Sequence, residues 1–205
     1  MSFYEQHVLP HLINCACGSP PILKLRSQIV PKAEGVVLEV GMGSGINLPF
    51  YDQSKVEYIW GLEPSLGMRN KAEQNLKSSS VNVRWLDLPG EKIPLEEDSV
   101  DTVLLTFTLC TIPDTSLALK QMRRVLKPGG KLLFCEHGQA EHHNVCSWQN
   151  RLNPLWSKLA GGCQLNRKMD ELIRNAGFQI EQLNTFYVPK TPRFAGYIYF
   201  GEARQ

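Results

Sequence analysis

The chain has 205 residues, of which 22 are basic and 20 acidic, so its net charge is +2 with histidine neutral. This length suits one domain that buries a full core, and the nearly balanced charge leaves no large field to attract nucleic acid or acidic lipid. No stretch approaches the roughly 20 apolar residues of a membrane span, and the N-terminus lacks a signal-peptide pattern, so we expect a cytoplasmic protein without a transmembrane segment. We also expect a monomer or weak homodimer that has no nucleic-acid partner.

An amphipathic helix is predicted near the start of the chain, over residues 3–17. Its apolar and ring-bearing residues are Phe3, Tyr4, His7, Val8, His11, Leu12 and Ile13. Such a helix can fold over bound ligands as a lid, and a helix that only packs on the core is an equally open alternative. We assign residues 1–34 to this N-terminal helical lid segment.

The segment 36–45, VVLEVGMGSG, is predicted to be a buried strand that breaks into a glycine-rich turn. Its first residues are apolar on both sides of the chain, which is typical of a strand covered on both faces of a parallel sheet. Gly41, Gly43 and Gly45 can adopt positive φ and let a ligand approach the backbone. A dinucleotide-binding turn needs a glycine where Ile46 stands, so this spacing favours a nucleoside ligand without phosphates.

A second strand is predicted over residues 56–62, and Glu63 follows it directly. An acid at the end of the neighbouring parallel strand can accept hydrogen bonds from both hydroxyls of a ribose. The two strand ends would then hold one nucleoside. The alternative is a tight turn beside an ordinary surface glutamate.

Alternating strand and helix patterns continue along the chain and predict a doubly wound α/β sheet with helices on both faces. Further strands are expected over residues 81–86, 101–106 and 131–137, and a closing antiparallel pair of strands over 178–188 and 194–203. Helices are expected from Ser65, from Thr115, near 150–159 and over 166–175, the last with Asn166 as its cap. The stretch 127–130, KPGG, is expected to stop the helix before it.

Six cysteines are spread along the chain without metal-ligand spacing. Cys110 and Cys135 lie in strand-like apolar runs of a chain large enough to fold without disulfides, so free thiols are expected. Cys15 and Cys17 form C-x-C rather than C-x-x-C, and the only adjacent histidines stand in a polar loop. We therefore predict no metal site.

The chain resembles the class I S-adenosylmethionine-dependent methyltransferases in four segments that follow one another at familiar spacing: VLEVGMGSG, GLEP, LPGEKIPLEEDSVDTV and RRVLKPGGKLLF. The segments TLCTIPD, FCEHG, WQNRLNPLWSKLAGGCQLNR and GYIYFGEA are similar to a narrower group, small bacterial relatives of the methyltransferase-like thiol S-methyltransferases. The front half is also similar to bacterial phosphatidylethanolamine and quinone methyltransferases.

This resemblance implies a single Rossmann-like domain over residues 1–205 with a seven-stranded sheet of order 3-2-1-4-5-7-6, the last strand antiparallel. Residues 35–137 would form the cofactor-binding core, and 138–205 the acceptor-side helices and closing strands. The implied cofactor is S-adenosylmethionine, with S-adenosylhomocysteine as the product.

The resemblance also implies the residues that contact the cofactor. The glycines would line its methionine part, Glu63 would bind the ribose and Pro64 would shape the adenine edge. The acid with which many relatives hold adenine aligns with Pro89, so the backbone around Gly90 and Glu91 is expected to take its place. The full expected set is Glu39, Gly41, Gly43, Gly45, Asn47, Glu63, Pro64, Gly90, Glu91 and Thr106.

Methyl transfer requires little of the protein beyond aligning a small-molecule acceptor, excluding water and in some cases removing a proton. The candidate catalytic residues are His137, Cys110 and Thr106. His137 can lower the pKa of a thiol, ordinarily roughly 8.5, or act as a general base. The alternatives are a histidine that fastens a strand end and a core cysteine.

The expected acceptor is an apolar thiol, with an ethanolamine phospholipid or a quinone as alternatives. The acceptor pocket is expected to be lined by an amphipathic stretch that contains Trp148, Leu152, Leu155, Trp156 and Leu159. The alternative interpretation is that this stretch contacts lipid peripherally. Two other classes stay open, a nicotinamide-dependent oxidoreductase and a non-catalytic cofactor-binding partner protein.

Overall fold

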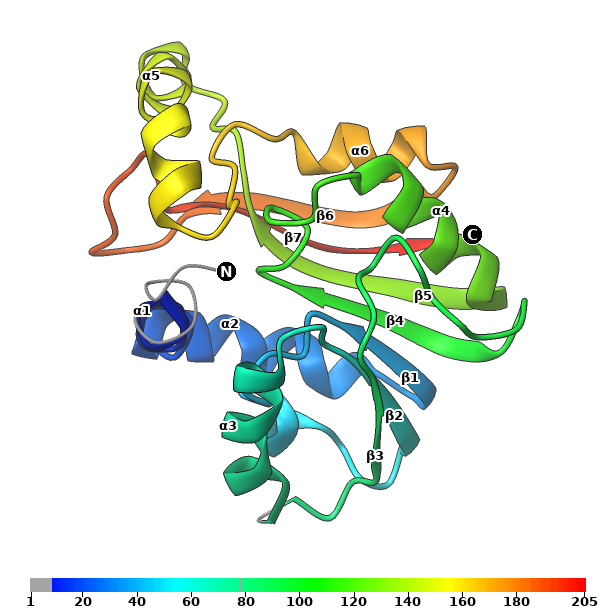
Figure 1. The fold of residues 1–205 in the computed structure, drawn as a ribbon. Helices are drawn as coiled ribbons and strands as arrows, with labels where there is room; N and C mark the ends of the chain where they lie inside the picture. Colours follow the sequence, from blue (N-terminus) through cyan, green and yellow to red (C-terminus); the bar gives the residue numbers. More distant parts are fainter. Residues whose placement is uncertain (1–8, 78) are drawn as a thin grey trace.

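The computed structural model describes residues 9–77 and 79–205 (Figure 1). Phe3, Tyr4, His7 and Val8 of the predicted N-terminal helix lie outside the described residues. Seven strands form one sheet in the order β3-β2-β1-β4-β5-β7-β6. They are β1 (Gly35–Val40), β2 (Val56–Leu62), β3 (Val83–Leu86), β4 (Val100–Thr106), β5 (Leu126–His137), β6 (Gln179–Tyr187) and β7 (Tyr197–Arg204).

The predicted strand order and strand directions are confirmed. β1 runs parallel to β2 and β4, β2 to β3, and β4 to β5, whereas β7 is antiparallel to β5 and β6. The chain leaves β1 toward β2 on one side and later returns to β4 on the other. The ends of β1 and β4 therefore meet at the point where strand order reverses, which is where ligands bind in open α/β sheets.

Helices cover both faces of this sheet. They are α1 (Leu9–Cys17), α2 (Pro20–Ile29), α3 (Leu66–Lys77), α4 (Thr115–Val125), α5 (His143–Leu159) and α6 (Met169–Asn175). In Figure 1, α4 and α6 lie on one side of the sheet, α2 and α3 lie on the other, and α5 projects from the edge.

The alternation of side chains along β1 explains how both faces are buried. Leu38 and Val40 join the core cluster that includes residues of α4 and α6, whereas Val37 joins the cluster that includes residues of α2. Every β1 residue after the first is buried. Burying an acidic side chain in a strand that is covered on both faces costs free energy. The burial of Glu39 on the α2 side therefore requires a structural or functional reason.

Several predicted boundaries are wrong, and the contacts give the reasons. β5 begins at Leu126, within one residue of the end of α4, because Leu126 pairs with Val100 of β4. The KPGG stretch therefore lies inside the strand. β3 begins at Val83, two residues later than predicted, and α2 was not predicted at all, although Ser19 and two prolines stand at its start.

The two C-terminal helices also differ from their predictions. α5 begins at His143 because the buried amide of Gln149 anchors its polar first half, accepting from the Ala140 N–H at 2.9 Å and donating to the Gly138 carbonyl at 2.9 Å. α6 begins at Met169, and Asn166 does not cap it because its side chain donates to Asn150 instead. Among the described helices, none is long and apolar enough to cross a membrane.

Candidate active site

Residues 41–45, here called the glycine turn, follow β1 at the sheet's reversal point. Gly41, Gly43 and Gly45 have φ values of 71°, 59° and 74°, as the sequence predicts. A Cβ on Gly41 would collide with Thr108, and one on Gly45 would collide with Leu48. A Cβ on Gly43 would meet the far end of the Met68 side chain at 3.3 Å and the Gly41 carbonyl oxygen at 3.9 Å. Gly41 and Gly45 thus permit tight packing, whereas the surroundings of Gly43 are more open.

Glu63 fastens the glycine turn to the end of β2. Its Oε2 accepts from the Gly43 N–H at 3.0 Å and its Oε1 from the Ser65 N–H at 2.8 Å. Burial raises the pKa of Glu63, and these two backbone donors oppose that effect. Glu63 therefore lies beside the glycine turn and is hydrogen-bonded to it, which the sequence did not predict.

Beneath the glycine turn, five buried side chains form what we call the polar floor. They are Arg26 of α2, Glu39, Asn47, Tyr51 and Thr106. The Asn47 amide nitrogen donates to Glu39 at 2.8 Å and to Thr106 at 2.9 Å, and the Tyr51 hydroxyl donates to Glu39 at 2.6 Å. The Arg26 guanidinium donates to Asn47 and to Thr106, each at 2.8 Å.

The polar floor explains why an acid can be buried in β1. Desolvation raises the pKa of Glu39, and the hydrogen bonds from Tyr51 and Asn47 and the charge of Arg26 oppose that shift. Both carboxylate oxygens of Glu39 and the hydroxyl of Thr106 are occupied by partners within the chain. The predicted site residues Glu39, Asn47 and Thr106 therefore meet in one network, and the network directs Thr106 toward the α2 face.

The predicted adenine side lies between β3 and α4. Gly90 is buried, and a Cβ there would stand 3.1 Å from Ile112 and 3.5 Å from Val40. Glu91 accepts from the Asp114 N–H at 3.2 Å, which ties this segment to the start of α4. Gly90 and Glu91 are thus placed beside the end of β1, where an adenine ring could lie against their backbone.

On the acceptor side, three residues from distant parts of the chain meet in what we call the sulfur cluster. Cys110 follows β4, His137 ends β5, and Cys163 lies between α5 and α6. The His137 Nε2 is 3.0 Å from the Cys163 Sγ, and the three donor atoms lie within 4.8 Å of one another. The sequence singled out two of these residues but not Cys163, because its loop shows no pattern that links it to Cys110.

Electrostatics in the sulfur cluster favour a charged Cys163. A hydrogen bond from Cys110, followed by those from His137 and Trp156, holds the pKa of the Cys163 thiol well below its usual range, against the desolvation that opposes them. The pKa of Cys110 rises correspondingly. Burial lowers the pKa of His137, but the hydrogen bond and charge of Cys163 and the charge of Glu136 together outweigh this effect and leave a net rise. The cluster thus favours a thiolate next to an imidazolium.

Glu136 connects the sulfur cluster to the end of β4. Its Oε1 accepts from the Thr108 N–H at 2.7 Å and from the Leu109 N–H at 3.1 Å, and burial raises its pKa to about 7. Thr108 in turn packs against Gly41. The loop 107–110 therefore connects the sulfur cluster to the glycine turn.

Helix α1 contacts both halves of the site. The Ser44 hydroxyl of the glycine turn donates to the Asn14 side chain at 2.5 Å. At the other end, Leu9 packs against Gly161 in the loop that carries Cys163. These contacts place α1 against both the glycine turn and the loop that carries Cys163.

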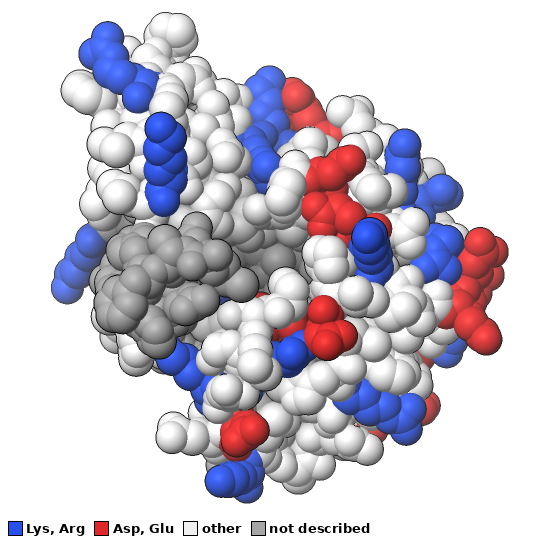
Figure 2. All heavy atoms as spheres, viewed as in Figure 1, with Lys and Arg blue, Asp and Glu red and all other residues white. Residues whose placement is uncertain are grey.

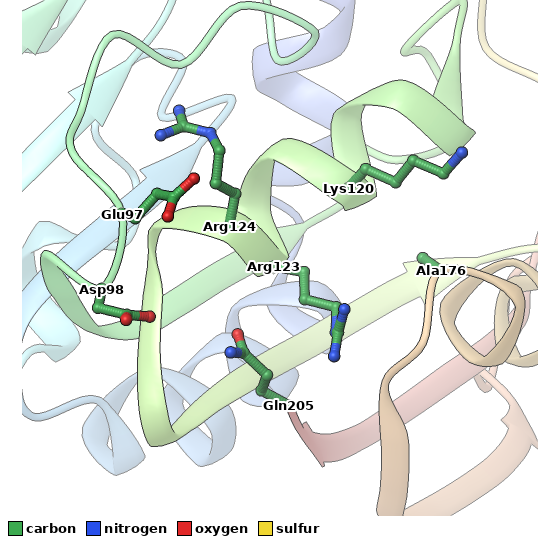
Figure 3. A pocket seen from close by; sticks show the side chains of 7 residues that line it. All are labelled: Glu97, Asp98, Lys120, Arg123, Arg124, Ala176 and Gln205. Atoms are coloured by element: carbon green, nitrogen blue, oxygen red, sulfur yellow. The ribbon is translucent and has the colours of Figure 1, made fainter.

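Two cavities lie away from this site. One of about 340 Å³ lies by the C-terminal end of α4, and its lining includes the basic residues Lys120, Arg123 and Arg124 and the acidic residues Glu97 and Asp98 (Figure 3). It lies beside the start of β4, so the glycine turn is at the opposite end of the strand. The other, of about 350 Å³, is lined by α5 residues including Trp148 and Arg151. Figure 2 shows acidic and basic side chains interspersed over the main body.

Comparison with known proteins identifies relatives of the sequence. Residues 38–134 match the family described as "Methyltransferase domain". The chain is 31% identical over 170 residues to the thiol S-methyltransferase TMT1A of Homo sapiens, covering 78% of this chain and 66% of that protein. It is 42% identical over 85 residues to a demethylmenaquinone methyltransferase of Streptomyces griseus, covering 40% of this chain and 34% of that protein. The chain thus spans just under two thirds of the human relative's length.

Solved structures share the fold. An S-adenosylmethionine-dependent methyltransferase from Aquifex aeolicus superposes with a TM-score of 0.67 at 20% identity, covering 95% of this chain and 97% of that one. The sheet order and the glycine turn described above are thus set in an architecture common to such structures.

Proposed function

We propose that this chain, which belongs to the class I S-adenosylmethionine-dependent methyltransferases, transfers a methyl group from S-adenosylmethionine to the sulfur of an apolar thiol. One observation carries the proposal, namely that the glycine turn fastened by Glu63 lies one short loop from a cluster of cysteine and histidine. The human relative is named a thiol S-methyltransferase, which supports the choice of acceptor. The nicotinamide alternative is set aside because S-adenosylmethionine is this family's cofactor.

In this proposal the predicted cofactor residues divide into two groups. The backbone of the glycine turn contacts the methionine part, Glu63 binds the ribose, and Pro64, Gly90 and Glu91 surround the adenine. Glu39, Asn47 and Thr106 act one layer below, where the polar floor keeps the glycine turn in place. The bound cofactor supplies an electrophilic methyl group on a sulfonium.

The chain's own task is to orient the acceptor and exclude water. The acceptor sulfur must approach the methyl carbon in line, at about 3 to 3.5 Å, before the new carbon–sulfur bond forms and the sulfonium carbon–sulfur bond breaks. Helix α1 covers the site, which keeps water away from the reacting atoms. Cys110 and His137 are the proposed acceptor-side groups, since both belong to the sulfur cluster.

An acceptor panel tests the proposal. The purified chain is incubated with methyl-labelled S-adenosylmethionine and with apolar thiols, a quinone, or vesicles of an ethanolamine phospholipid. We expect labelled thioether and no labelled lipid or quinone. Transfer to a quinone instead would favour the activity for which the Streptomyces griseus relative is named. Cofactor binding without transfer to any acceptor would favour a non-catalytic partner protein.

The outer face of α5 supports a second, weaker contact, with a lipid surface that would hold apolar acceptors. Trp148, Leu155 and Leu159 are exposed, and α5 contains Arg151 and Lys158 but no acid. Figure 2 accordingly shows basic and no acidic side chains on the projecting part at upper left. A helix of this composition can lie in a membrane interface by its apolar side.

A further inference from the structure

The sulfur cluster has the donor set of a metal centre. Cys110 and Cys163 offer sulfur, and His137 offers Nε2, with all three donor atoms within 4.8 Å of one another. Sulfur and imidazole ligands select zinc among the common divalent ions. Two donors on one tetrahedral zinc stand about 3.5 to 3.8 Å apart, given bonds of about 2.0 to 2.3 Å. The 3.0 Å between His137 and Cys163 needs to open only slightly to reach that spacing.

The segments that carry these ligands are tied to one another by the backbone. The Gln164 N–H donates to the Cys110 carbonyl at 2.9 Å. Arg167 donates to the carbonyls of Leu109 and Ile112 at 2.6 and 2.7 Å. Because these bonds fix the two cysteine loops relative to each other, the ligands are held together before any ion binds.

A second observation concerns the sulfur atom of Cys163. The indole N–H of Trp156 donates to it at 3.3 Å. Donors of this kind orient and stabilise thiolate ligands from outside the ligand shell. The cluster therefore has both the ligand residues of a metal site and an outer hydrogen bond that supports one of them.

We propose that Cys110, His137 and Cys163 bind a zinc ion whose fourth coordination position takes the sulfur of the thiol acceptor. Three protein ligands and one exchangeable position are the arrangement of catalytic zinc sites, whereas structural sites use four protein ligands. The identity of the fourth ligand rests on the proposed function; the three protein ligands do not. The site is adjacent to the glycine turn, because Thr108, two residues before Cys110, packs against Gly41.

The chemistry of this arrangement balances without a further reactant. Binding to zinc releases the acceptor's S–H proton to solvent and leaves a zinc-bound thiolate. The thiolate sulfur then forms a bond to the methyl carbon, the sulfonium carbon–sulfur bond breaks, and its electron pair stays on the cofactor sulfur. The thioether product is neutral, so it leaves the zinc more readily than a thiolate does.

Metal content tests the three protein ligands. The full chain is reduced with a phosphine, supplied with zinc sulfate, desalted and analysed by mass spectrometry of its metals. We expect about one zinc per chain, with loss of zinc in Cys110→Ser and in Cys163→Ser and full retention in Cys15→Ser, which removes an exposed cysteine outside the cluster. A thermal shift with S-adenosylhomocysteine shows that each variant is folded. Folded protein without zinc, or zinc retained by both cluster variants, would overturn the site.

Cobalt substitution tests the fourth position. Cobalt(II) bound by two thiolates should give an intense sulfur-to-metal charge-transfer absorption, absent from Cys163→Ser. Adding an apolar thiol should change the visible cobalt bands, and adding the matching alcohol should not. Cobalt bands that ignore the thiol would overturn the acceptor position.

The two proposals fail in different ways. A chain that binds zinc but methylates thiols equally well with and without it contradicts the acceptor position on zinc and leaves the proposed function standing. A chain that binds zinc through these residues but methylates no thiol contradicts the proposed function and the acceptor position.

Discussion

The polar floor and the sulfur cluster lie on either side of the glycine turn, and they differ in how completely the chain satisfies them. In the floor, Glu39, Asn47 and Thr106 bond to one another, to Tyr51 and to Arg26. On the acceptor side, Oε2 of Glu136 and Nδ1 of His137 are buried, and neither has a hydrogen-bond partner within the described part of the chain.

This difference separates two kinds of site. A buried polar network whose members are all paired rigidifies the structure around it. Buried polar atoms without partners are energetically costly and are retained where they have a functional use. We infer that folding alone satisfies the hydrogen-bonding groups of the polar floor, whereas the acceptor side keeps unpaired polar atoms that a ligand can bind.

The strongest way to break this comparison is to remove the guanidinium of the polar floor. Arg26→Ala leaves the buried side-chain amide oxygen of Asn47 without its donor and removes the positive charge near Glu39. We therefore expect the free energy of unfolding to fall by about 3 kcal/mol. Urea denaturation measures it. Arg174→Ala, at an exposed arginine of α6, is the matched control. A loss below about 1 kcal/mol would show that the floor is not rigidified by Arg26.

A change on the acceptor side should affect chemistry rather than folding. His137→Ala is expected to lower kcat for thiol methylation on the order of 100-fold, while the Kd for S-adenosylhomocysteine changes little. Steady-state kinetics and calorimetry separate the two effects. His143→Ala, at an exposed histidine of α5, should alter neither. An unchanged kcat in His137→Ala would show that this histidine has only a structural role at the end of β5.

The link between the two regions can be tested at Glu63. Glu63→Ala removes the ribose acceptor and both backbone bonds to Gly43 and Ser65, so we expect cofactor affinity to fall more than tenfold, roughly 1.4 kcal/mol or more. Calorimetry with S-adenosylhomocysteine measures this. Glu57→Ala alters an exposed glutamate on the same strand and should bind normally. Equal dissociation constants would refute the ribose contact.

The smallest expected effect concerns the outer face of α5. Leu155→Ser should reduce sedimentation with anionic vesicles by a few-fold, since it removes one exposed apolar side chain from the proposed interface. Leu66→Ser removes an equally exposed leucine from α3 and serves as the control. Equal loss in both variants, or no vesicle binding by the parent chain, would contradict peripheral contact.

The sequence predicted the glycine turn and its position after β1 but not the full sulfur cluster, because the signals for the glycine turn are local. The glycine turn and Glu63 follow contiguous apolar runs, so strand ends and their ligand-facing residues can be located from a short window. Arg26 shows the limit of that approach. Its neighbours Leu25 and Ile29 mark an apolar helix face, but nothing nearby reveals that a basic residue on that face meets Asn47.

The acceptor side is assembled by segments whose order in the chain differs from their order in space. Cys110 follows β4 and His137 ends the neighbouring β5, so these two residues could be paired once the sheet order was known. Cys163 joins them from the segment between α5 and α6. The prediction of no metal site relied on ligand spacing along the sequence, and the zinc site proposed above opposes it. Spacing along the sequence can detect ligands that lie within one loop, but not ligands that three separate segments contribute.

Arg26 also joins the floor to the covering helix. The same guanidinium that bonds Asn47 and Thr106 donates from Nε to the carbonyl of Cys17, the last residue of α1, at 3.4 Å. An outward swing of α1 would stretch this tether, so we expect departure of the demethylated nucleoside to depend on the polar floor. Weakening Arg26 should therefore hasten product escape, although no atom of that arginine need touch the product.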